Sequence, residues 1–237
     1  MINRNDFFRY SIDNGNCEIL FSNANNDIDF NLESEIGRIN LEKLIKEYSL
    51  NDLGWMKQIH SDNIIVYDGK VQMADGIITD KINIGIGVFT ADCVPIMFYC
   101  KKKKVCAAVH SGWQGTRKEI VSKMIDKLKN RYDISLEDLT IVIGPHNRKC
   151  CYEFGENMAK TYFNKYINEN KNTYDGKNLN LEECIIMQVL EKGIRRKNII
   201  TNNSCTYCDQ ENKFYSYRKL LKNKCGRMFS FVVIRNR

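Results

Sequence analysis

Eight short apolar runs, each long enough for one β-strand, constrain the fold of this chain more than any other feature. Several are bounded by Gly, Asp or Asn, which commonly end strands. The runs are CEILFS, WMKQIH, NIIVYDG, INIGIGVFT, VPIMFYC, VCAAVH, LTIVIG and MFSFVVIR. They do not alternate regularly with helices, as strands of a doubly wound parallel sheet would. The order therefore favours an α+β fold with mixed or antiparallel sheets.

Four helices are expected between these runs, at about residues 33–48, 116–132, 155–170 and 181–192. Thr116 and Glu119 have the spacing of a capping box, and apolar residues follow them at helical intervals. Asn180 and Gly193 have the composition of an N-cap and a helix stop. No Pro-rich or Ser-rich linker divides the chain, so a single domain is expected over residues 1–237.

Composition narrows the classes of function. Of the 237 residues 43% are apolar, which is enough for a sizeable core. No apolar run approaches the roughly 18 residues of a membrane span, and the N-terminus lacks the apolar stretch of a signal peptide. The net charge of +7 is scattered apart from Lys101–Lys104, which is expected to form a hairpin turn. Without a basic stripe interleaved with aromatic residues, no nucleic-acid partner is predicted. We expect a soluble, cytoplasmic protein of unknown oligomeric state that does not bind membranes.

Ten cysteines are unusual in a chain of this length. In a reducing compartment most are expected in the core, with a few as ligands or nucleophiles. Cys205 and Cys208 form half of a zinc or redox motif, but the chain has no second CxxC, and the adjacent Cys150 and Cys151 have the wrong spacing for a zinc knuckle. We therefore interpret Cys205 and Cys208 as ordinary structural thiols.

Three chemically distinctive residues are expected at the ends of strands. WMKQIH ends on His60, VFTADC on Cys93 and CAAVH on His110. Strand ends can converge at one rim of a sheet, where two imidazoles and a thiolate would suit zinc or copper. Three protein ligands leave a coordination position open, which is typical of catalytic zinc. Alternatively, Cys93 is a nucleophile and one of the two histidines is its base. Spacing alone does not separate these alternatives.

The chain also resembles the YfiH family, known as the multicopper polyphenol oxidase or laccase-domain family. The matching motifs occur in family order over about residues 54–230: KQIHSDNI, ADGIITD, TADCVPIMF, VHSGWQGT, GPHNRKCCYEFGE, CTYCD and FYSYRK followed by CGR. The family's metal ligands fall on His60, Cys93 and His110. The resemblance implies a single-domain α/β/β/α sandwich with mixed sheets, similar to the catalytic domain of cytotoxic necrotizing factor toxins.

The resemblance implies chemistry on purine nucleosides. Members have been named laccases, peptidoglycan-editing factors and purine nucleoside enzymes. We expect zinc-dependent phosphorolysis of adenosine, inosine and S-methyl-5'-thioadenosine, with phosphate as co-substrate, together with deamination of adenosine to inosine. A cysteine amidase acting on peptidoglycan precursors and a copper-dependent polyphenol oxidase are the alternatives. Three histidines are too few for a multicopper centre.

Five further residues are expected around this site. Asp92 is interpreted as support for Cys93, as a proton carrier or as a turn former. Arg218 and Arg227 are expected either to hold an anion or to lie on the solvated surface, and Trp113 either to stack on a purine or to cap the core. Gln114 stands where relatives usually carry Arg, which would weaken phosphate binding here.

His146 is a second departure from the family, at a position where an aliphatic residue is commoner. It is expected to face either the same pocket or solvent.

Overall fold

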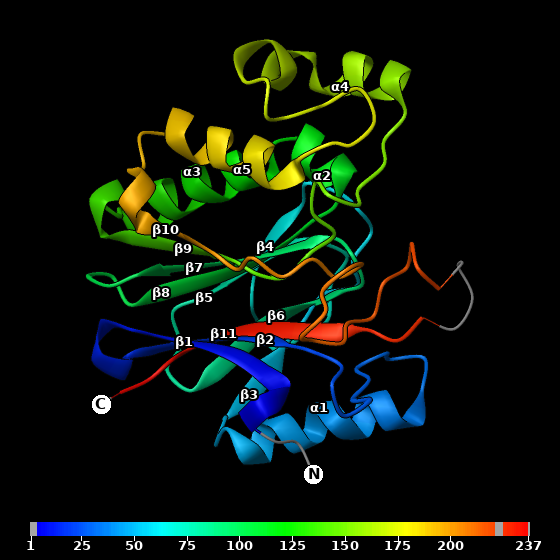
Figure 1. The fold of residues 1–237 in the computed structure, drawn as a ribbon. Helices are drawn as coiled ribbons and strands as arrows, with labels where there is room; N and C mark the ends of the chain where they lie inside the picture. Colours follow the sequence, from blue (N-terminus) through cyan, green and yellow to red (C-terminus); the bar gives the residue numbers. More distant parts are fainter. Residues whose placement is uncertain (1–3, 221–224, 237) are drawn as a thin grey trace.

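Two stacked β-sheets lie between two helical layers in the computed structural model, which describes residues 4–220 and 225–236 (Figure 1). The first sheet has the order β1 (Phe7–Ile12), β2 (Cys17–Ser22), β11 (Met228–Ile234), β6 (Ile84–Thr90) and β3 (Asp52–Gly54). The second has the order β10 (Ile199–Thr201), β9 (Leu139–Ile143), β7 (Val94–Cys100), β8 (Val105–Ser111), β5 (Gly76–Thr79) and β4 (Ile64–Val66). Each sheet mixes parallel and antiparallel pairs, which confirms the predicted mixed sheets.

The helices cover the outer faces of the sheets. Their bounds are α1 (Glu35–Glu47), α2 (Trp113–Arg117), α3 (Ile120–Tyr132), α4 (Glu156–Glu169) and α5 (Leu181–Glu191). Helix α1 lies against the first sheet, whereas α3 and α5 lie side by side against the second, with α4 beyond them (Figure 1). This arrangement confirms the expected α/β/β/α layering. No helix in the described part of the chain is long and apolar enough to cross a membrane.

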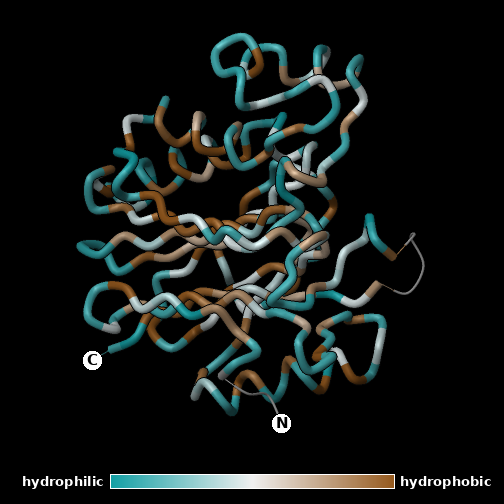
Figure 2. Tube along the Cα trace, viewed as in Figure 1, coloured by the Kyte–Doolittle hydropathy of each residue, from teal (hydrophilic) through white to brown (hydrophobic). Residues whose placement is uncertain are grey.

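Three apolar layers hold the elements together, and the period of two along a strand assigns side chains to them. In β7, Ile96 and Phe98 pack toward the helices, whereas Met97 and Tyr99 pack between the two sheets. Because strands buried on both faces read as continuous apolar runs, the central strands were easy to predict. Figure 2 shows the hydrophobic segments along the strands and the hydrophilic ones on the outer turns.

Two sequence-based expectations about local structure were wrong. WMKQIH is not a strand, because β3 ends at Gly54 and the following residues form a loop up to His60. The helix expected over 116–132 is broken into α2 and α3, and Glu119 between them has a left-handed φ of 58°. Thr116 Oγ1 donates to Gly112 O within α2 instead of capping a helix. Tertiary contacts thus replace the predicted capping box, since Glu119 accepts a hydrogen bond from Tyr166.

Candidate functional site

A cavity of about 700 Å³ opens at one end of the sandwich, where loops from both sheets meet. Its volume is in the range of small-molecule sites. Its lining comprises Asn31, Leu32, Glu33, Met56, Lys57, Gln58, His60, Phe89, Thr90, Ala91, Asp92, Cys93, His110, Trp113, Gln114, Tyr152, Leu181, Tyr217, Arg218 and Arg227. All three candidate ligands and all five further candidates from the sequence lie in this lining.

His60, Cys93 and His110 form what we call the three-donor site. One donor atom from each lies within 4.8 Å of the others. Cys93 Sγ is 4.0 Å from His60 Nε2, and the two imidazole rings meet edge to face with their centroids 4.9 Å apart. The structure therefore brings together three residues that are 33 and 17 positions apart in the chain.

Each of the three reaches the site by a different local route. His110 is in β8, on the face that carries Ala108 into the layer between the sheets. Cys93 is in the short connection that passes from β6 in one sheet to β7 in the other, so it does not end the strand VFTADC as predicted, because β6 stops at Thr90. His60 is in a loop with a left-handed φ of 56°, not at a strand end as predicted. A non-glycine residue held in this region requires support from its surroundings.

The support comes from Asp75, a fully buried carboxylate that sequence reasoning did not single out. Asp75 Oδ1 accepts from the backbone amide of His60 at 3.1 Å, and Oδ2 accepts from the amide and hydroxyl of Ser61, both at 2.6 Å. Oδ1 also lies 2.9 Å from Nδ1 of His110. One carboxylate therefore positions both histidines.

Strand register explains how Asp75 reaches His110. β5 pairs antiparallel with β8, with Gly76 opposite Val109, so that Asp75 lies across from His110. The backbone amide of His110 donates to Asp75 O at 2.8 Å. Because a carboxylate accepts, the Asp75 contact places the imidazole proton on Nδ1 and leaves Nε2 of His110 available to a ligand or to Cys93. The sequence signal that could have identified Asp75 was its place in ADG, directly before a strand.

Electrostatics at the site favour charged forms of its groups. Burial alone would raise the pKa of the Cys93 thiol, but the charge of His110 and hydrogen bonds from both histidines outweigh it and lower this pKa to about 6. Burial would lower the pKa of His110, but Cys93 and Asp75 raise it to about 9. A thiolate beside an oriented imidazole is equipped both to bind a metal and to act as a nucleophile.

Gly112 is required beside the three-donor site for reasons of space. A Cβ at this position would lie 2.9 Å from Cys93 Sγ and 3.2 Å from His60 Cδ2. Both separations are tighter than ordinary van der Waals contact. The glycine therefore permits the close approach of helix α2 to the donors.

Asp92 lies in the cavity wall, and both oxygens of its carboxylate already accept hydrogen bonds. Oδ1 accepts from the Thr206 hydroxyl at 2.7 Å, and Oδ2 accepts from the backbone amide of Arg218 at 2.7 Å. The backbone amide of Asn147 donates to Asp92 O at 2.9 Å. Through these hydrogen bonds Asp92 connects three segments of the cavity wall. Proton transfer by Asp92 remains a prediction.

The two arginines are held in place around the cavity. Arg218 Nη1 donates to Glu153 O at 2.9 Å, and its guanidinium lies 4.8 Å from the centroid of the Tyr152 ring. Arg227 Nη1 donates to the carbonyls of Cys225 and Gly226. Both arginines line the same cavity as the three-donor site.

Gln114 and Trp113 also line the cavity, from the first turn of α2. The Trp113 ring stacks on Tyr162, with the centroids 5.6 Å apart, and contacts Phe154 at 5.9 Å. Trp113 therefore packs on the helical layer and presents only its remaining surface to the cavity. Both of its predicted roles, in the core and at the pocket, are compatible with this position.

His146 faces neither the pocket nor solvent, so both expectations for it were wrong. Its side chain is buried, and Nδ1 lies 2.9 Å from Gly144 O. Nε2 is 3.5 Å from the Glu182 carboxylate. Burial lowers the pKa of His146 to about 4, so the ring is neutral near pH 7.

Comparison with known proteins gives consistent relatives. A family model described as multi-copper polyphenol oxidoreductase laccase matches residues 13–235. A purine nucleoside phosphorylase of Clostridium acetobutylicum is 43% identical over 217 residues, which are 91% of each chain. A purine nucleoside phosphorylase of Borreliella burgdorferi is 34% identical over 185 residues, which are 72% of this chain and 75% of that protein.

Two solved structures share the fold. YlmD from Geobacillus stearothermophilus matches with a TM-score of 0.87 at 22% identity, over 100% of this chain and 98% of its own. The YfiH protein of Bacillus licheniformis matches with a TM-score of 0.86 at 24% identity, over 98% of this chain and 100% of its own. At these identities the likeness concerns the fold alone.

Proposed function

The chain belongs to the multi-copper polyphenol oxidoreductase laccase family, also called the YfiH family, and from this membership we propose that it is a zinc-dependent purine nucleoside phosphorylase that also deaminates adenosine. Two curated relatives, one of them 43% identical, carry the name purine nucleoside phosphorylase. Adenosine, inosine and S-methyl-5'-thioadenosine are the proposed nucleosides. The proposal includes a single domain over residues 1–237 and a cytoplasmic location.

The three-donor site has the chemistry that zinc requires. His60, Cys93 and His110 would hold the ion, and the Asp75 carboxylate orients one of the imidazoles, as supporting carboxylates do at zinc sites. Two nitrogens and one thiolate are a known ligand set for catalytic zinc, which keeps one position for water or substrate. When bound, zinc would supply Lewis acidity and would lower the pKa of a water molecule toward neutrality.

The rest of the cavity would bind the nucleoside. Met56, Phe89, Trp113, Tyr152 and Leu181 supply apolar and aromatic surface for a purine and a ribose. Because Trp113 is already fixed against Tyr162, little conformational entropy would be lost when a base packs on its exposed part.

Arg218 and Arg227 are the proposed phosphate-binding residues. Phosphorolysis needs an anionic nucleophile held near C1′ of the ribose and stabilisation of the developing charge. The hydrogen bonds that fix both guanidinium groups would keep them positioned for this task. Gln114 would contribute only a neutral amide at the position where relatives usually carry a cation.

One observation carries the proposal: the three donor atoms and two fixed arginines line one nucleoside-sized cavity. The test combines metal analysis of the purified protein with chromatography of products from adenosine, with and without phosphate. We expect about one zinc at the three-donor site, adenine and ribose 1-phosphate only with phosphate, and inosine under both conditions. Zinc-loaded protein that converts no nucleoside would refute the proposal.

A cysteine hydrolase remains the second candidate, because Asp75, His110 and Cys93 also have the order of a carboxylate, a base and a nucleophile. Peptidoglycan precursors are the substrate class for this alternative. Inactivation by a thiol alkylator together with full activity in chelator would favour it over the zinc enzyme.

Copper chemistry is the third candidate. The chain has three histidines, and the two that reach the cavity with Cys93 could serve one copper ion but not a multicopper cluster. The same metal analysis separates copper from zinc.

A further inference from the structure

Four cysteines from two distant segments meet outside the cavity. The ligand atoms of Cys150, Cys151, Cys205 and Cys208 all lie within 4.8 Å of one another. Cys150 Sγ and Cys208 Sγ are 3.6 Å apart. From sequence we interpreted Cys205 and Cys208 as ordinary thiols, because the chain has no second CxxC. In the structure they lie beside the adjacent residues Cys150 and Cys151 instead.

The separations suit a single ion. Zinc binds thiolates at about 2.3 Å, so the sulfurs of a tetrahedral ZnS₄ site are roughly 3.8 Å apart. An iron–sulfur cluster would hold its cysteines further apart, since inorganic sulfides and several irons lie between them. A disulfide requires a sulfur separation of about 2 Å. Four converging thiols at these distances therefore match a mononuclear thiolate site better than either alternative.

Two turns deliver the four thiols. In the segment after β9, the amides of Cys151 and Tyr152 both donate to Arg148 O. In the segment after β10, the amide of Asp209 donates to Cys205 O. The segments are tied together because Arg148 Nη1 donates to Asn202 O at 2.8 Å. The cluster is thus preformed by backbone contacts on both sides.

One of the four thiols accepts a hydrogen bond from the backbone. The amide of Arg148 donates to Cys205 Sγ at 3.5 Å. Donors of this kind stabilise a metal-bound thiolate and offer little to a neutral thiol.

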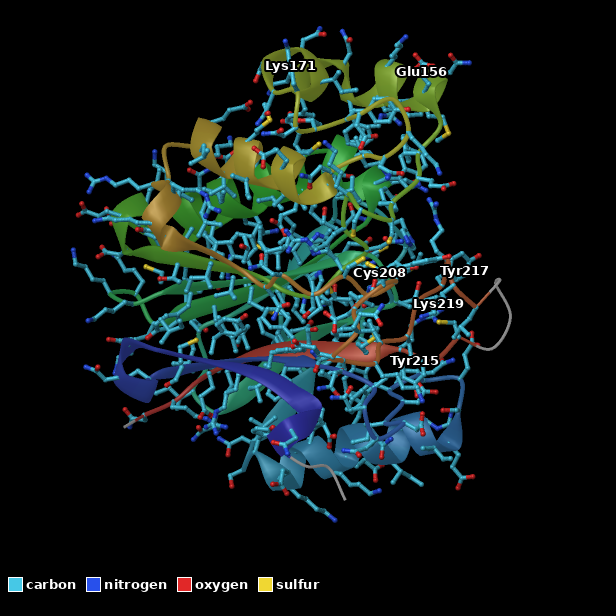
Figure 3. All side chains as sticks on the ribbon, viewed as in Figure 1. Glu156, Lys171, Cys208, Tyr215, Tyr217 and Lys219 are labelled. Atoms are coloured by element: carbon cyan, nitrogen blue, oxygen red, sulfur yellow. The ribbon has the colours of Figure 1, made fainter. Side chains whose placement is uncertain are left out.

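One cation lies beside the CxxC turn. Lys219 Nζ donates to Tyr207 O at 3.2 Å. Figure 3 labels Lys219 and Cys208 on the same side of the molecule. Four thiolates and one divalent ion have a net charge of −2, which a nearby cation would offset in part.

We propose that Cys150, Cys151, Cys205 and Cys208 form a structural zinc site, separate from the three-donor site, that stabilises the wall of the cavity. The segment after β9 carries Tyr152, which lines the cavity. The CxxC turn carries Thr206, whose hydroxyl donates to Asp92. Four protein ligands leave no open position, so this zinc has a structural and not a catalytic role.

The test measures zinc in protein purified under reducing conditions, in a His110→Ala background that disables the three-donor site. We expect about one zinc per chain in this background and less than about a tenth after Cys150→Ser and Cys208→Ser are added. These two thiols are exposed, so the fold should survive their replacement. Cys184→Ala, which changes a buried thiol on α5 outside both clusters, should retain the zinc. Because the background removes the other site, the result does not depend on the proposed nucleoside activity.

A second set of measurements starts from the wild-type protein. In the reduced wild-type protein, alkylation of the exposed Cys150 and Cys208 should be slowed on the order of tenfold until a strong chelator is added. Cobalt substituted into the His110→Ala protein should show an intense thiolate-to-cobalt charge-transfer band. Zinc-free His110→Ala protein with both thiols promptly alkylated would overturn the proposal. A Cys150–Cys208 disulfide with no bound metal would also overturn it, in favour of a redox pair.

Discussion

The two thiol-containing sites differ in how they face their surroundings. The three-donor site combines two imidazoles with one thiolate, and its donors face a cavity of about 700 Å³. The four-thiol cluster, defined by Cys150, Cys151, Cys205 and Cys208, is packed between two turns and does not contribute to the cavity lining. With zinc in both, the first would keep a position for substrate chemistry and the second would have none.

The supporting residues differ in the same direction. The three-donor site depends on one buried carboxylate, Asp75, which accepts from the backbone amides of His60 and Ser61 and orients His110. In the four-thiol cluster the corresponding contact comes from the backbone, since the amide of Arg148 donates to Cys205 Sγ. A side-chain support tunes an imidazole ligand, whereas amide donors only stabilise thiolates. Zinc would thus have a catalytic role at one site and a structural role at the other, depending on the residues that support its ligands.

Loss of a ligand should have the largest effect. His110→Ala should lower adenosine turnover by at least about 100-fold, since loss of a ligand's supporting partner alone costs up to that amount. Zinc content should fall by about one equivalent while the four-thiol cluster keeps its own. The matched control is His146→Gln, which replaces a histidine that does not line the cavity. If His110→Ala keeps its full zinc and is inactive, His110 is a direct catalyst, and the contrast between an open and a closed metal site disappears.

Loss of the carboxylate support should have the next largest effect. Asp75→Asn should weaken zinc binding and turnover by about 10- to 100-fold, because an amide nitrogen would face donors where the carboxylate accepted. Zinc affinity is measured by competition with a chelator, and chemical unfolding is measured separately. Asp52→Asn is the control, since Asp52 accepts from the Tyr67 hydroxyl at 2.6 Å and does not line the cavity. Unchanged zinc affinity in Asp75→Asn would show that His110 needs no such orientation.

The three candidate donors could be singled out from sequence, but their support could not. His110 lies near the end of β8, a recognisable buried strand, and Cys93 lies in the connection after β6, so the local sequence pattern was enough to single out both. Asp75 acts through the register of β5 with β8, and β5 is too short, at four residues, to stand out in the sequence. The histidine at position 60 was predicted for an incorrect reason, because it occupies a strained loop and not a strand end.

For the fold, too, some features could be predicted from sequence and others could not. Mixed sheets were predicted from the order of the apolar runs, and the α/β/β/α layering was implied by the family resemblance; the structure agrees with both. The break between α2 and α3 was not predicted, because it depends on contacts of Glu119 with Tyr166, 47 residues away. The four-thiol cluster was likewise invisible, as its two halves lie about 55 residues apart in the chain and meet only when β9 pairs with β10.

Crowding of the three-donor site should have an intermediate effect. Gly112→Ala would place a Cβ 2.9 Å from Cys93 Sγ and should lower turnover roughly tenfold, since displacement of a reacting group by about 1 Å can cost on the order of 100-fold. Gly115→Ala is a close control in the same helix, because its Cβ would meet Ile120 at an ordinary 3.4 Å. The measurement is turnover together with zinc per chain. Equal activity in the two variants would show that the spacing at Cys93 is not critical, and the four-thiol cluster should be unaffected in both.

The smallest expected effect concerns the open side of the three-donor site, where Gln114 lines the cavity with Arg218 and Arg227. Gln114→Arg would add a cation that can donate charge-assisted hydrogen bonds to phosphate. At this half-exposed position we expect about a fivefold lower apparent KM for phosphate in the cleavage of inosine, or ~1 kcal/mol, because such bonds contribute modestly when water competes. Deamination of adenosine uses no phosphate and should change little. Gln114→Met removes the amide without adding charge, so it should not improve phosphate use. If Gln114→Arg leaves the phosphate dependence unchanged, the anion binds elsewhere in the cavity. If it slows deamination and phosphorolysis equally, the new side chain obstructs the nucleoside, and position 114 limits the space for the nucleoside in the cavity.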